Sequence, residues 1–535
     1  MSETRKSWLS IVLLWLFLLV LAASRPLTLP DEGRYAEIGR WMLLSGDWLT
    51  PRLNGLPFFH KPPLLHWLQA ISLHGFGETP WSARLVPAAH AGLMLVAMYL
   101  AARRMANEAT ARRAVWMLGG SLTFLYGGQF VNHDMMVATW IGVAIWCFAA
   151  AILSEGATRQ WLALAGFAAC AMGVLSKGLI GLVLPGLVLF VWLFVARLWR
   201  HVPRLPWISG VLLLLVMALP WFVLVERVHP GVFDYLIIGQ HFRRYTGDTF
   251  NNQWPVWSYL AVMLVLLFPW AFLVLADALQ ALLRRRVPVW RAASPWPALL
   301  WVWLIAITVF FTIPKSKLVG YILPVMPPLA LLAALFWQSR WGRSARASKV
   351  FVLLCALNLG VGVLASKEAE RQSLLGGNSD VAQVLSCRMS PQDRVLVAEG
   401  YPYGLAFEAH LQQPLIVVSD WMRARKVIGD GWRSELFEGA DFDVQAGRVL
   451  QPLEVLAQTP PAGRWLVTPK GAFAPDALTA WRKTYEGRAS TLWESVAYPA
   501  GSSAAAQSQN AACRSLPTGS ADALGWWARL RSAAP

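Results

Sequence analysis

Long apolar runs dominate the first two thirds of the chain and leave little choice of fold. They recur at about 20 residues each, beginning with SWLSIVLLWLFLLVLAA near the N-terminus, and about 20 apolar residues are what an α-helix needs to cross a bilayer core of roughly 30 Å. Only 14% of all residues are charged, against about 25% in soluble domains. We therefore expect a polytopic α-helical membrane protein.

The apolar runs divide into about eleven expected spans. We interpret the first as a retained helix, because no small-residue cleavage site precedes the polar loop that follows it. Lys177 and Gly178 divide one nearly continuous run into two spans. The expected spans lie near residues 8–26, 84–102, 114–131, 134–153, 160–175, 178–196, 206–225, 255–277, 297–313, 318–337 and 348–366.

The distribution of basic residues predicts the orientation of these spans. With the N-terminus inside, every even-numbered connection contains arginine, as the positive-inside rule requires of cytoplasmic loops. The larger loops 24–83 and 226–254 are then expected to face outward. Orientation also explains the net charge of +17, so we expect no nucleic-acid partner.

The composition changes from about residue 367 onward. DRVLVAEG, PLIVVSD and GRWLVTP predict short buried strands, and GLAFEAHL predicts a helix between them. We therefore divide the chain into a transmembrane domain at 1–366, an α/β domain at 367–500 on the outer side, and a flexible tail at 501–535. Cys387 and Cys513 both lie on that side, where an oxidising compartment permits a disulfide between them.

The first outer loop combines helical patterning with charged residues. Apolar residues recur at helical spacing between Asp31 and Gly46, which predicts a helix in the interface plane with Arg34 and Glu37 on its wet side. A second helix is expected to begin at KPPLLHWLQAI, because proline is tolerated in a first helical turn. Alone, Asp31 is explained as a helix cap and Lys61 as a lysine that reaches headgroup level. Their presence in one loop suggests a site.

Polar residues gather at four further outer helix ends. Each has an ordinary structural explanation: a helix cap, an anchor for a helix end, cations that suit a helix macrodipole, or an aromatic-belt anchor. These candidates are Asp134; Lys177; His241, Arg243 and Arg244; and Lys315, Lys317 and Tyr321.

In the expected topology all of these groups lie on one face of the membrane, and the cations outnumber the carboxylates. A phosphate that leaves water must be paired with such cations. A lipid phosphate fits this requirement, because its charge sits at headgroup level while its tail can lie in a groove between spans. The sequence therefore predicts a site for an anionic lipid head at the outer face.

The same stretches resemble a known family. The chain is similar to the aminoarabinose transferases of Gram-negative bacteria, members of the wider protein-mannosyltransferase-like group with the GT-C fold. The resemblance covers the region from Asp31 to about Pro328 and the plan of an outer C-terminal domain. The most specific matches are DEGRYAEIGR and, later in the same loop, KPPLLHWL; the supporting matches are NHDMM, SKGLIGLVLP, QHFRRYTG and KLVGYILPVMPPLALL.

The resemblance implies a multi-pass enzyme of the bacterial inner membrane, with its active site and C-terminal domain in the periplasm. Such an enzyme moves a sugar from undecaprenyl phosphate to the phosphate groups of lipid A. Asp31 would be the essential first-loop aspartate, and Asp134 a second functional aspartate. The groups around the donor phosphate would be Lys61, Lys177, Arg244 and Tyr321, to which we add Arg34, Arg243 and Lys317 as substrate-binding candidates.

At one position the chain departs from the family pattern. The aminoarabinose transferases have a glutamate immediately before KPP, where this chain has His60, and His241 would match a metal-ligand histidine. Imidazole is itself a good zinc ligand. His60 and His241 are therefore the candidate ligands for a divalent metal such as zinc, and both the metal and the identity of the sugar stay open.

The expected chemistry follows from the charges. Transfer from a polyprenyl phosphate develops negative charge on the departing phosphate, and fixed cations aimed at that charge stabilise the transition state. Asp31 would orient a phosphate acceptor or bind a positively charged amino sugar; with a hydroxyl acceptor it would be the general base. Direct displacement predicts inversion at the anomeric carbon.

Two alternatives to this function remain at this point. A transferase of the same fold with a hydroxyl acceptor on a protein or glycan would use the same groups, because acceptor choice lies in pocket shape. A secondary transporter would place ionisable groups or broken helices near the bilayer midplane, whereas here the polar groups lie at outer ends. An amino sugar such as aminoarabinose is the expected donor sugar, with a neutral hexose as the alternative.

Overall fold

The computed structural model describes residues 2–243, 253–283, 294–428, 431–457, 464–473 and 478–497, with the backbone alone for 241–243. The chain divides into two compact units. Unit 1 consists of Met1–Ser24, Phe59–Ser72 and Trp81–Glu368, and unit 2 of Arg25–Phe58, Leu73–Pro80 and Ala369–Pro535. The sequence predicts domain boundaries near residues 366 and 500. The two units do not follow these boundaries alone, because unit 2 also includes two segments of the first outer loop, Arg25–Phe58 and Leu73–Pro80.

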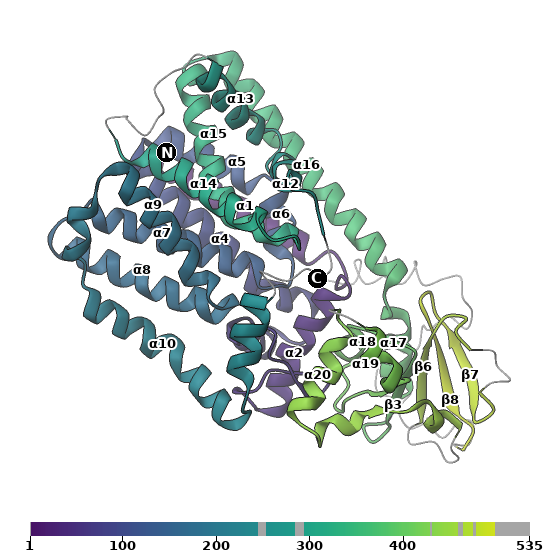
Figure 1. Cartoon of the computed structure of the whole chain (residues 1–535). Helices are drawn as coiled ribbons and strands as arrows, with labels where there is room; N and C mark the ends of the chain where they lie inside the picture. Colours follow the sequence, from purple (N-terminus) through teal and green to yellow (C-terminus); the bar gives the residue numbers. More distant parts are fainter. Residues whose placement is uncertain are drawn as a thin grey trace. The chain divides into compact units, whose positions relative to one another are not determined.

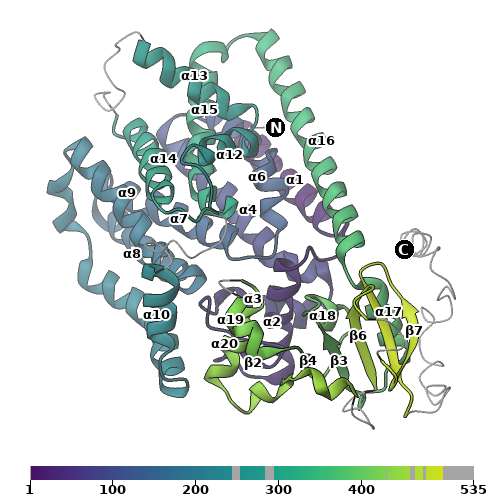
Figure 2. The same ribbon diagram turned by 45° about the vertical axis from the view of Figure 1, so that its right-hand side comes forward.

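Unit 1 is a helical bundle. Within the described ranges, seven helices are long and apolar enough to cross a membrane, and three shorter apolar helices accompany them. Figures 1 and 2 show these helices. The helices of unit 1, including the short ones, are α1 (Glu3–Ala22), α3 (Leu64–Phe76, whose last residues belong to unit 2), α4 (Pro80–Met105), α5 (Glu108–Gly119), α6 (Leu122–Leu125), α7 (Asp134–Ile152), α8 (Gly156–Lys177), α9 (Ile180–Ala196), α10 (Trp207–Val228), the π-helix η3 (Asp234–Arg243), α12 (Ser258–Leu266), α13 (Trp270–Leu283), α14 (Trp296–Thr312), the 3₁₀ helix η5 (Val319–Val325), α15 (Met326–Trp341) and α16 (Ala345–Gly376), which continues into unit 2.

Two of the expected spans are not continuous helices. The expected span at 114–131 is interrupted after α5, where glycine pairs at 119–120 and 127–128 lower the helix propensity. The expected span at 255–277 consists of α12 and α13 with a break before Trp270. The break contains Pro269, which has no N–H to continue a helical hydrogen-bond ladder.

The division of the 160–196 run into two helices is confirmed. α8 ends at Lys177, Gly178 follows with φ 83°, and α9 begins at Ile180. Gly173 and Gly181 face each other so closely that a Cβ on either would overlap the backbone of the other. The two glycines therefore let α8 and α9 approach backbone to backbone, which fixes the position of Lys177 at their turn.

Unit 2 contains the first-loop helix and an α/β domain. α2 (Asp31–Ser45) and the hairpin of β1 (Arg52–Leu53) and β2 (Leu56–Pro57) come from the first outer loop. The elements of the C-terminal part are α17 (Ser379–Arg388), β3 (Val395–Ala398), α18 (Leu405–Glu408), β4 (Ile416–Val418), α19 (Trp421–Val427), α20 (Ser434–Phe442), β5 (Leu450–Gln451), β6 (Trp465–Pro469), β7 (Trp481–Glu486) and β8 (Ser490–Ser495).

The strands of the C-terminal part form one sheet in the order β5-β4-β3-β6-β8-β7, drawn in green to yellow in Figure 2. The four strands from β5 to β6 pair in parallel, and β8 and β7 are antiparallel. The three predicted strands are confirmed as β3, β4 and β6, and β3 is buried along its whole length, as continuous apolar runs in parallel sheets are. β7 and β8 were not predicted.

Two further expectations concern this unit. The predicted helix at GLAFEAHL is confirmed in part as α18, a single turn. Cys387, in α17, is disulfide-bonded. Cys513, the partner expected for it, lies outside the described residues.

Candidate active site

Asp134, Lys177 and Tyr321 meet at one end of the unit 1 bundle. Lys177 forms an ion pair with the Asp134 carboxylate, and its Nζ lies 4.7 Å from the centroid of the Tyr321 ring. The side chains of Lys177 and Asp134 are only 11% and 13% exposed. A largely buried ammonium between a carboxylate and an aromatic face is held in a fixed position. Such a group can bind an anion without reorganising.

The local sequence explains how Asp134 is placed. Asp134 is the first residue of α7, and His133, not Asp134, is the cap. The Asn132 side chain brackets it, because Asp134 N–H donates to Asn132 Oδ1 (2.9 Å) while Asn132 Nδ2 donates to Asp134 Oδ2 (3.0 Å). The plain-cap explanation for Asp134 is therefore wrong. Its carboxylate is directed at Lys177 rather than at the helix backbone.

The third element of this cluster is η5, and its glycine decides how close it lies. A Cβ on Gly320 would overlap the Asp134 carboxylate. Only glycine therefore lets η5 lie against the start of α7, which brings the Tyr321 ring over Lys177. Sequence reasoning missed Gly320, although it lies in the matched stretch KLVGYILPVMPP.

Lys317 lies in the segment before η5 and is almost fully buried, at 2% exposure. Its Nζ donates to the carbonyls of Pro314 (2.7 Å) and Trp254 (3.2 Å). Burial lowers the pKa of Lys317, because the charged form loses hydration. An ammonium has three N–H donors, so one donor remains for an anionic ligand.

The remaining unit 1 candidates lie near the start of α3. The Tyr235 hydroxyl is 2.8 Å from His60 Nε2, and Lys61 Nζ donates to the His60 carbonyl at 2.9 Å. Sequence reasoning missed Tyr235, whose only signal was its place in the FDYLIIGQHFRRYTGD stretch. Arg244 and the side chains of His241 and Arg243 lie outside the described residues.

Asp31 and Arg34 lie in unit 2. Asp31 is the first residue of α2, with Pro30 as the cap position, so the plain-cap explanation for Asp31 is wrong as well. Arg34 Nη2 donates to Asp31 Oδ1 (2.6 Å) and Arg34 Nη1 forms an ion pair with Glu435. The Asp31 side chain is 36% exposed, whereas those of Arg34 and Glu435 are 6% and 8% exposed. A buried arginine thus connects an accessible carboxylate to α20.

The prediction that Arg34 and Glu37 lie on the wet side of α2 is wrong. Both are buried, at 5% and 2% exposure, and so is Arg40. Glu37 accepts two hydrogen bonds from Arg40, each at 2.8 Å. The polar face of α2 is covered by α18 and its neighbours in the same unit, so that charge pairing replaces hydration.

The described side chains do not assemble a metal site. Among them, no group of three or more His, Cys, Asp or Glu residues could hold an ion. His60 Nε2 lies 2.8 Å from the Tyr235 hydroxyl. The side chain of His241, the other candidate ligand, lies outside the described residues, and we derive no step of the chemistry from a metal.

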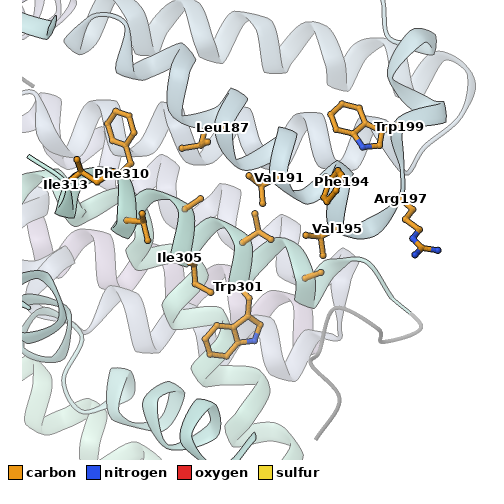
Figure 3. A pocket seen from close by; sticks show the side chains of 14 residues that line it. Leu187, Val191, Phe194, Val195, Arg197, Trp199, Trp301, Ile305, Phe310 and Ile313 are labelled. Carbon is orange, nitrogen blue, oxygen red and sulfur yellow. The ribbon is translucent and has the colours of Figure 1, made fainter. Parts of the chain in front are cut away.

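An apolar hollow of about 1070 Å³ lies between α9 and α14 (Figure 3). At one end it is lined by Arg197 and Trp199, and at the other by Ile313, just before the segment that carries Lys317. Its walls are aliphatic and aromatic side chains such as Val191, Phe194 and Ile305. A surface of this kind fits a hydrocarbon chain rather than a polar ligand.

Comparisons with known proteins agree with this geometry. A family model described as dolichyl-phosphate-mannose-protein mannosyltransferase matches residues 60–223. Undecaprenyl phosphate-alpha-4-amino-4-deoxy-L-arabinose arabinosyl transferase 1 of Pseudomonas fluorescens is 32% identical over 65% of this chain and 62% of its own length. Its counterpart in Pseudomonas aeruginosa is 32% identical over 68% of this chain and 64% of its own length. The chain thus spans a little under two thirds of these relatives.

Solved structures extend the likeness to almost the whole chain. The crystal structure of ArnT from Cupriavidus metallidurans bound to undecaprenyl phosphate superposes with a TM-score of 0.77 at 25% identity, covering 92% of this chain and 98% of that one. The oligosaccharyltransferase of Archaeoglobus fulgidus shares the fold alone, with a TM-score of 0.52 at 16% identity over 86% of this chain and 69% of that one. With the cluster of Asp134, Lys177 and Tyr321 in the stretches that carried the resemblance, the chain is similar to the aminoarabinose transferases and has the fold of the GT-C membrane glycosyltransferases.

Proposed function

We propose that this protein transfers a sugar, an amino sugar such as aminoarabinose, from undecaprenyl phosphate to a phosphate group of lipid A at the periplasmic face of the inner membrane. The observation that carries the proposal is the Lys177 ammonium held between Asp134 and Tyr321 at one end of the bundle. The names of the relatives and the undecaprenyl phosphate bound to the Cupriavidus structure support the choice of donor.

In this proposal the donor lies along unit 1. Its polyprenyl tail occupies the hollow between α9 and α14, whose far end reaches Ile313. Its phosphate is bound by Lys177, with Lys61, Lys317 and Arg244 as further cations. A tail in an apolar groove gains burial free energy at roughly 25 cal/mol per Å², and that energy holds the reacting phosphate in place.

The reaction is a single displacement at the anomeric carbon. An oxygen of the acceptor phosphate forms a bond to the carbon while the bond to the undecaprenyl phosphate oxygen breaks, which inverts the configuration. The leaving phosphate gains negative charge, and Lys177 stabilises that charge more in the transition state than in the ground state. Asp31, held by Arg34, orients the acceptor or binds the ammonium of the amino sugar.

A second candidate function is transfer to a hydroxyl group of a protein or glycan. One observation favours it: residues 60–223 match the family model described as dolichyl-phosphate-mannose-protein mannosyltransferase. Asp31 would then act as general base. The transporter alternative has no comparable support, since the relatives reported above are transferases by name.

The test is mass spectrometry of lipid A from bacteria with and without this protein. The proposal expects a species heavier by one amino sugar on a phosphate, present with the native chain and absent with Lys177→Met. An unchanged lipid A, together with loss of a glycosylated protein, would instead establish the hydroxyl acceptor. Product that retains the anomeric configuration would overturn the single displacement.

A further inference from the structure

The sheet of unit 2 reverses its strand order between β3 and β6. The chain runs from β3 through β4 to β5 at one edge and then returns to β6 on the other side of β3. In open parallel sheets, ligands bind in the crevice outside the carboxyl ends of the two strands that flank such a reversal. The C-terminal ends of β3 and β6 are therefore where a binding site is expected.

A cavity of about 190 Å³ lies at this place. Its walls are the ends of β3 and β6, the loop 399–402 that follows β3, and single residues from other parts of unit 2: Asn378, Arg433 and Ser490. All lining residues belong to unit 2. The cavity thus shares no residue with the cluster around Lys177.

The backbone next to the cavity is strained. Glu399, directly after β3, has φ 57°, a left-handed conformation that is unfavourable for a non-glycine residue. Its carbonyl accepts a hydrogen bond from Arg433 Nη2 at 3.2 Å. The Tyr403 hydroxyl donates to the Trp432 carbonyl at 2.7 Å, which fixes the segment carrying Arg433. Strain that the surrounding structure maintains in this way is typical of ligand sites.

The polar side chains of the cavity are held in place before any ligand arrives. The Ser490 hydroxyl donates to Asn378 Oδ1 (2.5 Å), and Trp493 Nε1 donates to Thr468 Oγ1 (2.9 Å). Asn378, Thr468 and Ser490 are 6%, 1% and 7% exposed. The Asn378 amide N–H groups and the Thr468 O–H remain as donors.

The lining selects the chemical class of the ligand. Glu399 and Arg433 supply one negative and one positive charge, so the cavity favours neither a phosphate nor a metal ion. Its other lining residues include the hydroxyl and amide side chains of Ser490, Thr468 and Asn378 as well as Tyr401 and Pro402. A sugar ring likewise combines polar edges and apolar faces. The volume equals about six water molecules at ~30 Å³ each, which suits one ring and is too small for a nucleotide.

We propose that this cavity at the switch between β3 and β6 binds one monosaccharide unit of a glycan, as a site distinct from the proposed transfer site. The proposal does not depend on the transfer reaction, because it rests on unit 2 alone.

The experiment is saturation-transfer-difference NMR on the full chain in detergent, with glucosamine, N-acetylglucosamine and galactose as probes at millimolar concentration. We expect signals from at least one sugar with the native chain and with Lys177→Ala, which removes a transfer-site cation. Arg433→Ala should weaken binding at least tenfold. So should Gly400→Val, which adds bulk beside the Arg433 guanidinium without removing any polar group.

Arg423→Ala is the matched control, since this exposed arginine of α19 does not line the cavity, and its signals should equal those of the native chain. Circular dichroism checks that each variant is folded. Absence of signal from all three sugars, equal signals from native and both cavity variants, or loss of the signal in Lys177→Ala would each overturn the proposal. Displacement of the sugar by inorganic phosphate would overturn the assigned ligand class.

Discussion

Lys177 is confined on two sides within unit 1, by the Asp134 carboxylate and the Tyr321 ring. We expect Lys177→Met to lower the transfer rate by about 10²- to 10³-fold, the usual loss on removing one preorganised group that stabilises a developing charge. Lys177→Arg should keep part of the rate. The measurement is transfer from undecaprenyl-phosphate sugar in proteoliposomes. Lys349→Met, at an exposed lysine of α16, is the control and should keep the native rate.

Lys317 gives the site a pH dependence. Burial lowers its pKa, so it loses its proton at a lower pH than an ordinary lysine, whose pKa is about 10.4. A deprotonated amine cannot attract phosphate. The KM for the donor should therefore rise as the pH rises through this lowered pKa, and it should stay flat in Lys317→Arg, which keeps its charge. Equal KM profiles for the two proteins between about pH 7 and pH 10 would contradict the role of Lys317.

At the scale of elements, the close approach of η5 to α7 depends on Gly320. Gly320→Ala would push its Cβ into the Asp134 carboxylate and separate that carboxylate from Lys177. We expect at least a tenfold loss of transfer rate with normal membrane insertion. Gly186→Ala is the matched control, because a Cβ on this glycine of α9 meets no atom within 4 Å. A native rate in Gly320→Ala would show that the two elements have room to adjust.

The link from α20 to α2 passes through Arg34. Glu435→Gln removes one of its two carboxylate partners and leaves a buried guanidinium paired with Asp31 alone, so Asp31 should be drawn toward Arg34 and away from its ligand. We expect the KM for the acceptor to rise severalfold and the thermal unfolding midpoint to fall. Asp441→Asn changes another carboxylate of α20, one that forms an exposed ion pair with Arg425 of α19, and it should change neither quantity. A loss of stability with an unchanged KM would mean that Glu435 has a purely structural role.

The elements were predictable where a single local pattern decides them. Apolar periodicity and Gly46 place α2, and the apolar runs after residue 390 place β3, β4 and β6. The burial of the polar face of α2 was not predictable. Helical spacing distinguishes the apolar face from the polar face, but it does not show which other elements cover the polar face. β7 carries the mixed pattern WRKTYE, which periodicity alone does not identify as a strand.

The candidate site was also predictable only in part from the sequence. Asp134, Lys177 and Tyr321 are in contact, as three motifs on one face suggested. The pairing of Arg34 with Glu435 was not foreseeable, since the two residues are 401 positions apart and α20 has no feature that marks Glu435. The role of Gly320 was not foreseeable either, because only the structure shows that the Asp134 carboxylate occupies the position of a Cβ at residue 320.

For the whole molecule, unit 2 is built from two regions of the chain. A chain ending at residue 368 would keep the long apolar helices of unit 1 but would remove the partners of α2, including Glu435 and α18. We expect such a chain to insert into the membrane and to show no measurable transfer. Protease accessibility of the first loop, compared between the native and shortened chains, would show whether α2 loses its protection. Full transfer activity of the shortened chain would rule out any need for unit 2.

The split origin of unit 2 also restricts how members of this family can exchange parts. A chimera that takes its C-terminal region from a relative but keeps residues 25–58 of this chain would place Arg34 opposite a foreign surface, with its guanidinium buried and its partner Glu435 replaced. Recombination that respects the fold has to move the first outer loop and the C-terminal region together, although some three hundred residues of membrane helices separate them in the gene.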